Sequence, residues 1–200
     1  WMMTDIENVR GLLCFAEAAE RFHDPGSAEI RAEAEDYLAV MRNTMERFVK
    51  EAEGKDELRI PLSPDGNDAE LIRSYYPNFN FGFFTSLGIV KDEDVERVLN
   101  YIISQGIYGN GLYGHMPYKD GNMHIWYTSV PDYYWFLTWM RLGNRERARD
   151  IIRCQIDYSM TDEYYMIERY ADNDPYYVPW SPNASANGRA IIMMAEYWNN

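Results

Sequence analysis

Apolar residues recur at intervals of three and four along most of the chain, a period typical of amphipathic α-helices. The first such stretch predicts a helix over residues 5–22, with Thr4 as its N-cap and Glu7 three positions further on. The segment 24–27, Asp-Pro-Gly-Ser, then interrupts the pattern, and Ser27 is expected to cap a longer helix that ends near Gly54. These two helices together predict an αα-hairpin.

The middle of the chain predicts two shorter helices after an extended connection. Residues 55–68 contain a turn at Pro-Asp-Gly and a very short strand is expected at Ile60 and Leu62. A helical region should start near Asp68, break at Pro77 and resume to Leu87. An acidic first turn at 91–94 then predicts a fourth helix that ends near residue 105.

Three further helices are expected in the carboxyl-terminal half. Residues 106–125 form a glycine-rich connection, and Pro131 is tolerated in the first turn of a helix over 129–142. That helix is apolar nearly all round, so it should lie inside the structure. A sixth helix follows over 144–159, and a last one runs from Ser185 or its neighbours to Trp198.

Polar amphipathic helices alternate with more apolar ones, joined by short turns on one side and by long loops on the other. That alternation predicts two layers of helices and therefore an all-α fold of the (α/α)6 toroid type, with the long loops gathered at one face. About seven helices are expected within 1–200, which would make the chain a single αα-toroid domain or the C-terminal part of one.

Composition narrows the possible ligands. The formal net charge of −13 argues against nucleic acid and anionic membranes as partners, since the arginines form no basic face. The amino-terminal residues lack the pattern of a signal peptide, which favours the cytoplasm slightly. Cys14 and Cys154 both fall in helical patterns, so buried free thiols are expected. A neutral carbohydrate meets no electrostatic penalty, and no cofactor motif is evident.

Residues 161–189 concentrate the residue types of a sugar-binding site. Carboxylates, amides, an arginine and a dense set of tyrosines crowd a segment that several prolines interrupt. Aromatic faces stack on the apolar faces of sugar rings, and carboxylates, amides and guanidinium groups hydrogen-bond the hydroxyls. The alternative is a rigid surface loop whose tyrosines fill gaps between helices.

Five segments carry a family resemblance, namely residues 69–72, 94–98, 111–114, 139–148 and 166–191. In order and spacing they resemble the second half of the six-hairpin glycosidases, closest to the glucoamylase-like and glycogen-debranching-like hydrolases. The resemblance implies that Glu168 is the general base and that Asp5 or Glu7 is the general acid. It also implies that a missing N-terminal half of the toroid, or a homo-oligomer, covers an open apolar flank.

Each catalytic candidate has a structural alternative. Glycoside hydrolysis needs one protonated carboxyl and one carboxylate flanking the scissile bond. Arg169 could hold Glu168 ionised as a base, but an ion pair with Arg169 or Arg189 could also serve only to shape the loop. Acidic residues such as Asp5 and Glu7 are common partners of the dipole in a first helical turn.

Asp132, at the start of the aromatic helix, either binds a sugar hydroxyl or satisfies free amides at that helix start. A few aromatic side chains should stack on sugar while most fill the core, and Tyr133 belongs to this aromatic set. His115 and His124 lack the spacing of a zinc site, so no metal is expected. The other substrate-binding candidates are Trp126, Tyr127, Trp135, Tyr177, Trp180, Asn183, Arg189 and His115.

The sequence therefore predicts a carbohydrate-active enzyme domain, a glycoside hydrolase that acts on an oligosaccharide or glycoside by paired carboxylates. One alternative is a sugar epimerase or polysaccharide lyase on the same fold, in which His115 or Tyr113 would act on a ring proton. Another is a noncatalytic sugar-binding or helical scaffold fragment.

Overall fold

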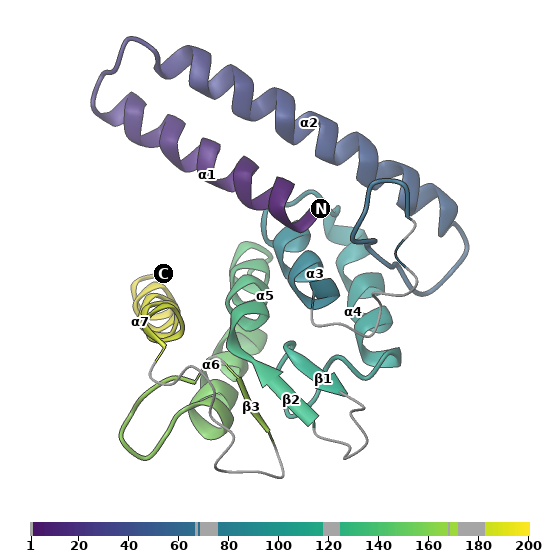
Figure 1. Cartoon of the computed structure of the whole chain (residues 1–200), viewed down its shortest axis with the longest axis vertical. Helices are drawn as coiled ribbons and strands as arrows, with labels where there is room; N and C mark the ends of the chain where they lie inside the picture. The colour runs from purple at the N-terminus through teal and green to yellow at the C-terminus, as the bar shows by residue number, and fades with distance from the viewer. Residues whose placement is uncertain (1, 67, 69–75, 118–124, 168, 172–182) are drawn as a thin grey trace.

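The computed structural model of the chain describes residues 2–66, 68, 76–117, 125–167, 169–171 and 183–200. The described part is dominated by seven α-helices, which confirms the all-α class (Figure 1). A 3-10 turn, η2 (Asp92–Asp94), leads directly into α4. The helices are α1 (Met2–Arg21), α2 (Ser27–Glu51), α3 (Tyr76–Ser86), α4 (Val95–Ser104), α5 (Ser129–Arg141), α6 (Arg145–Ser159) and α7 (Ala184–Asn199).

A small antiparallel sheet was not predicted. Its strands are β1 (His115–Pro117), β2 (Ile125–Thr128) and β3 (Arg169–Ala171), in the order β1-β2-β3. The expected strand at Ile60 and Leu62 is wrong, although both residues are buried. The three real strands are only three or four residues long, too short for an alternating pattern to stand out from the surrounding glycines and prolines.

Several helix starts differ from the prediction. α1 begins at Met2, so Thr4 lies inside the helix and does not cap it. At the start of α2 the carboxylate of Asp24 accepts a 2.7 Å hydrogen bond from the Gly26 amide, and Ser27 is the first helical residue. The predicted break at Pro77 is wrong: Pro77 lies in the first turn of α3, where a missing amide hydrogen is tolerated.

The helices contact each other in a regular order. Each odd-numbered helix contacts the next odd-numbered one, so that α1, α3, α5 and α7 form a continuous series. The even-numbered helices pack against this series: α2 on α1, α4 on α3, and α6 on both α5 and α7. Figure 1 shows α7 almost end-on while α5 lies nearer the plane of the view, so these two helices cross steeply.

The core is centred on α5, as its apolar sequence predicted. Trp135, Phe136 and Trp139 are at most 2% exposed. Between α3 and α5 the hydroxyls of Thr85 and Thr138 hydrogen-bond each other at 2.8 Å, which leaves neither hydroxyl unsatisfied in the core. One hydrophobic cluster includes residues from both ends of the chain, from α1 to α7.

The α1–α2 hairpin extends well beyond the other helices (Figure 1). Its base, at the start of α1 and the end of α2, joins the core through residues such as Met2, Met45 and Phe48. Of the two thiols expected to be buried, Cys154 on α6 is buried but Cys14 on α1 is exposed. None of the described helices is long and apolar enough to cross a membrane.

Candidate functional site

Asp132 lies in the first turn of α5 and is 1% exposed. Its Oδ1 accepts hydrogen bonds from the backbone amides of Tyr113 (2.6 Å) and Gly114 (3.3 Å). Its Oδ2 accepts a 3.4 Å bond from Nε2 of Gln155 on α6. The carboxylate therefore neither caps its own helix nor reaches the surface in this conformation, and it fastens the 109–114 loop to α5 and α6.

Burial raises the pKa of Asp132 to about 7, because desolvation of the charged form outweighs the three hydrogen bonds that favour it. Tyr113 stacks on the indole of Trp135, with ring centroids 4.7 Å apart. Trp135 itself is fully buried, so the ring predicted to stack on sugar packs against a protein side chain instead. Both residues are part of the core around α5.

Tyr113 is poorly placed for the proton abstraction that an epimerase or lyase would require. Its hydroxyl accepts a 2.9 Å hydrogen bond from Nε1 of Trp139, and the side chain is 4% exposed. Burial raises the pKa of the phenol well above its ordinary value, which stabilises the protonated form. A buried neutral phenol is a weak base and has no access to substrate.

The two predicted acid candidates on α1 face different neighbours. Asp5 accepts a 2.7 Å hydrogen bond from the Tyr37 hydroxyl on α2, within the hairpin. Glu7 faces α5, where its Oε2 lies 3.4 Å from the Tyr134 hydroxyl. Positions two apart on a helix are about 200° apart around its axis, which explains why the two carboxylates diverge.

Glu7 belongs to a cluster of polar and aromatic residues between α1, α5 and α7. The Nε of Arg10 lies 3.5 Å from Oε1 of Glu7, and its guanidinium stacks over the Tyr134 ring at 4.8 Å. A third contact ties Arg10 to α3 through a 2.6 Å hydrogen bond to Ser86. Glu7 Oε1 and Arg10 Nε are buried atoms without a hydrogen-bond partner among the described residues, since their 3.5 Å ion pair lacks hydrogen-bond geometry.

The charge of Arg189 on α7 acts on two tyrosines of α5 beside these residues. Burial raises the pKa of Tyr134 to about 12, and Glu7 adds to the rise while the positive charges of Arg10 and Arg189 oppose it. Burial also raises the pKa of Tyr133, again against the charges of Arg10 and Arg189. We call these five residues the α1–α5–α7 cluster: Glu7, Arg10, Tyr133, Tyr134 and Arg189.

Glu7 and Asp132 do not share one site. Tyr134, which contacts Glu7, lies two positions after Asp132 on α5 and therefore on nearly the opposite side of that helix. The three described carboxylates that the sequence singled out thus point to three different neighbours, namely α2, α5 and the 109–114 loop.

The remaining predicted residues are only partly described. Glu168, Tyr177 and Trp180 lie outside the described residues. In the sheet, His115 of β1 pairs in register with Tyr127 of β2, and Trp126 of β2 pairs with Ala171 of β3. The sheet therefore brings the backbone at the predicted residues His115, Trp126 and Tyr127 together.

Asn183, a predicted sugar ligand, is the N-cap of α7. Its Oδ1 accepts a 2.8 Å hydrogen bond from the Ala186 amide, which satisfies one of the free donors at the helix start. The neighbouring Asn187 accepts a 3.0 Å bond from the Met166 amide through Oδ1. Asn183 therefore caps α7, and Asn187 ties the first turn of α7 to the segment that contains Met166.

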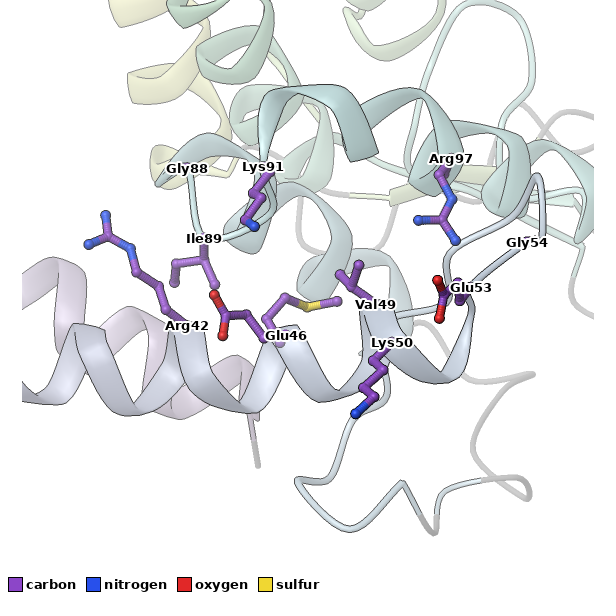
Figure 2. A pocket seen from close by; sticks show the side chains of 11 residues that line it. Arg42, Glu46, Val49, Lys50, Glu53, Gly54, Gly88, Ile89, Lys91 and Arg97 are labelled. Carbon is purple, nitrogen blue, oxygen red and sulfur yellow. The ribbon is translucent and has the colours of Figure 1, made fainter.

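A groove of about 730 Å³ lies elsewhere, between α2 and the 88–91 segment (Figure 2). Figure 2 shows Arg42 and Glu46 directed toward the segment that carries Lys91, whereas Lys50 points away from it. Arg97 is already held by Asp94, at 2.6 Å. Charges of both signs and aliphatic side chains line the groove, but no aromatic ring does, so it lacks a stacking platform for sugar.

Comparisons of the chain with protein-family models, with curated proteins and with solved structures find no match. Among the residues that the structure describes, no three metal-ligating side chains come together.

Sequence reasoning named Glu7, Arg189 and Tyr133 but missed Arg10 and Tyr134. The spacing of Arg10 was a usable signal, because residues three apart on a helix share a face. Tyr134 gave no such signal, since an aromatic residue inside an apolar helix is more often part of the core.

Proposed function

We propose that the chain is a carbohydrate-active enzyme domain that hydrolyses a glycosidic bond, with its sugar site at the α1–α5–α7 cluster. The observation that carries the proposal is that Glu7, Arg10 and Tyr134 contact each other between α1 and α5, and that the charge of Arg189 on α7 acts on both tyrosines. The partly exposed ring of Tyr133 can stack on sugar, and the charged groups can bind its hydroxyls. Two of its polar atoms also lack a hydrogen-bond partner among described residues.

Within this proposal Glu7 is the general acid and Glu168 is the general base. Glu7 is the better of the two acid candidates because its side chain faces the cluster and is 40% exposed. Asp5 is committed to Tyr37 inside the hairpin, so it would need to break that bond to act on substrate.

The toroid remains part of the proposal. The order of helix contacts supports it, since an inner series of alternate helices covered by the others is the arrangement of two αα layers. The steep crossing of α5 and α7 departs from a regular toroid, whose inner helices run side by side. We propose that the missing half of the toroid, or a second copy of the chain, completes the ring.

A panel of α- and β-linked 4-nitrophenyl glycosides tests the catalytic assignment. We expect Glu7→Gln to lower turnover by at least about 100-fold, because general acid catalysis is commonly worth that much. Asp5→Asn should keep turnover within a few-fold. Glu17→Gln serves as the matched control, because Glu17 is an exposed α1 carboxylate that pairs with Arg21 within the helix.

Two results would contradict the assignment. One is Glu7→Gln turning over at the parent rate, and the other is Asp5→Asn losing turnover as severely as Glu7→Gln. A parent protein that hydrolyses no glycoside of the panel, yet binds oligosaccharide, would favour the noncatalytic sugar-binding alternative.

A further inference from the structure

The distal part of the α1–α2 hairpin makes its described hydrogen bonds and ion pairs within the hairpin. We call residues 11–40 the arm. Within the described chain, the hydrogen bonds and ion pairs of residues 15–36 join residues of the hairpin to each other, as in the pairs Arg21–Glu17 and Arg31–Glu20. Figure 1 shows the tip of the arm standing clear of the other helices. The arm is therefore presented to solvent on several sides.

One face of the arm is apolar and exposed. Phe15 is 59% exposed and Phe22 is 85% exposed. With Gly11 and Ala18, which are also exposed, they recur at intervals of three and four residues. Gly11, Phe15 and Ala18 therefore share one side of α1, and Phe22 follows in the turn after the helix ends at Arg21. Ala16 and Ala19 of α1 are buried. We call this stripe of Gly11, Phe15, Ala18 and Phe22 the arm face.

The arm is strongly acidic. It contains seven carboxylates and two arginines, a formal charge of −5. Both arginines are paired with glutamates of α1, whereas no described ion pair involves four exposed carboxylates of α2. These four are Glu29, Glu33, Glu35 and Asp36.

The charge of the arm decides between the two obvious kinds of partner. Two copies packed arm to arm would bring −5 against −5, and each whole chain carries −13, so repulsion opposes self-association at this face. A helix with an apolar stripe and flanking lysines or arginines suits both features of the arm, because its stripe can cover the two phenylalanines and its positive charge is attracted by the arm's net charge of −5.

We propose that the arm face binds a basic amphipathic helix of a partner protein. This docking site is separate from the α1–α5–α7 cluster and does not depend on hydrolysis. The two phenylalanines are the anchors, because large aromatic side chains at the centre of an interface carry most of the binding energy. The carboxylates supply the attraction that selects a basic partner.

A synthetic helical peptide of about 18 residues, with leucine on one face and lysine on the other, serves as the probe. Its control is the same peptide with glutamate in place of lysine. We expect calorimetry on the full chain to show that the lysine peptide binds and the glutamate peptide does not. Binding of the lysine peptide should weaken as salt concentration rises, because exposed charges are screened.

Surface variants locate the site. Phe15→Ser combined with Phe22→Ser should weaken binding of the lysine peptide by at least about 10-fold. Val40→Ser is the matched control, because Val40 is an exposed apolar residue of α2 at 52% exposure, and it should leave binding unchanged. All of these side chains are exposed, so circular dichroism should report the same helix content and thermal transition in each variant.

Three results would overturn the proposal. The first is equal binding of the lysine peptide to the parent and to the double phenylalanine variant. The second is equal binding of the glutamate peptide. The third is a dimer of the parent chain in sedimentation experiments that the double variant abolishes, which would assign the arm face to self-association.

Discussion

Asp132 shows how a single buried carboxylate can organise a loop. It receives two backbone amides from Tyr113 and Gly114 and one side-chain amide from Gln155, which ties the loop, α5 and α6 together. Gln155 also donates to the Ser129 carbonyl at 3.1 Å, so one glutamine bridges two acceptors at the start of α5. Loss of any member would leave a buried polar group without its partner, which is costly.

The raised pKa of Asp132 predicts a pH-dependent stability. Between the ordinary pKa of about 4 in the unfolded chain and the folded value of about 7, the folded protein retains a proton that the unfolded chain has released. The contribution of this group is therefore complete below about pH 4 and is lost as pH rises through about 7. This contribution of Asp132 to the free energy of unfolding is at most about 4 kcal/mol, because a difference of one pKa unit is worth about 1.4 kcal/mol.

Urea unfolding of the parent and of Asp132→Asn between about pH 5 and pH 7.5 measures this effect. The free energy of unfolding of the parent should fall relative to that of the variant as pH rises, since asparagine does not titrate. A constant difference between the two proteins across that range would show that Asp132 does not titrate there.

At the scale of single residues, sequence reasoning identified positions better than roles. Asp132 and Asn183 were both chosen as sugar ligands from their residue type and place before a helix. The structure uses the first to hold a distant loop and the second as a helix cap. The amides that Asp132 accepts from lie about twenty residues earlier in the sequence. Helical periodicity gives no information on contacts between residues so far apart.

The contact between α3 and α5 depends on one glycine. A β-carbon added to Gly82 would lie 2.8 Å from Cβ of Tyr134 and 3.2 Å from the carbonyl oxygen of Pro131. Tyr134 also packs edge-on against Phe83, with ring centroids 4.1 Å apart. The close approach of these two helices therefore positions one of the tyrosines of the α1–α5–α7 cluster.

Gly82→Ala should separate α3 from α5 and lower the free energy of unfolding by about 1–3 kcal/mol, the usual effect of overpacking a core. Gly188→Ala in α7 is the matched control, because no atom lies within 4 Å of the added β-carbon. That change should leave stability unchanged or raise it by up to about 1 kcal/mol, since alanine favours a helix. Equal stability of the two variants in urea unfolding would contradict the tight α3–α5 contact.

At the scale of elements, the helices were predictable because each is long enough to repeat its apolar pattern over several turns. α5 and α6 follow the predicted ranges to within a residue or two. The sheet was not predictable, because each strand is only three or four residues long and β3 lies about forty residues after its partner β2. The start of α2 was also missed, because Gly26 and not Ser27 is its N-cap and no side chain caps the helix.

At the scale of the whole molecule, the α1–α5–α7 cluster draws Glu7, Tyr134 and Arg189 from helices that begin near residues 2, 129 and 184. Sequence analysis could name some of these residues but could not place them together, because their meeting depends on the order in which the odd-numbered helices pack. The toroid that the family resemblance implies, and the base role of Glu168, remain predictions.

The central claim is that the α1–α5–α7 cluster binds sugar. It is tested most directly by a crystal structure of the chain with a bound oligosaccharide. The oligosaccharide is chosen from a glycan panel by its binding to the Glu7→Gln variant. The account predicts a sugar ring stacked on Tyr133, with its hydroxyls within hydrogen-bond distance of Arg10 and Arg189. A sugar bound at another surface with the α1–α5–α7 cluster empty, or no oligosaccharide of the panel bound at all, would contradict it.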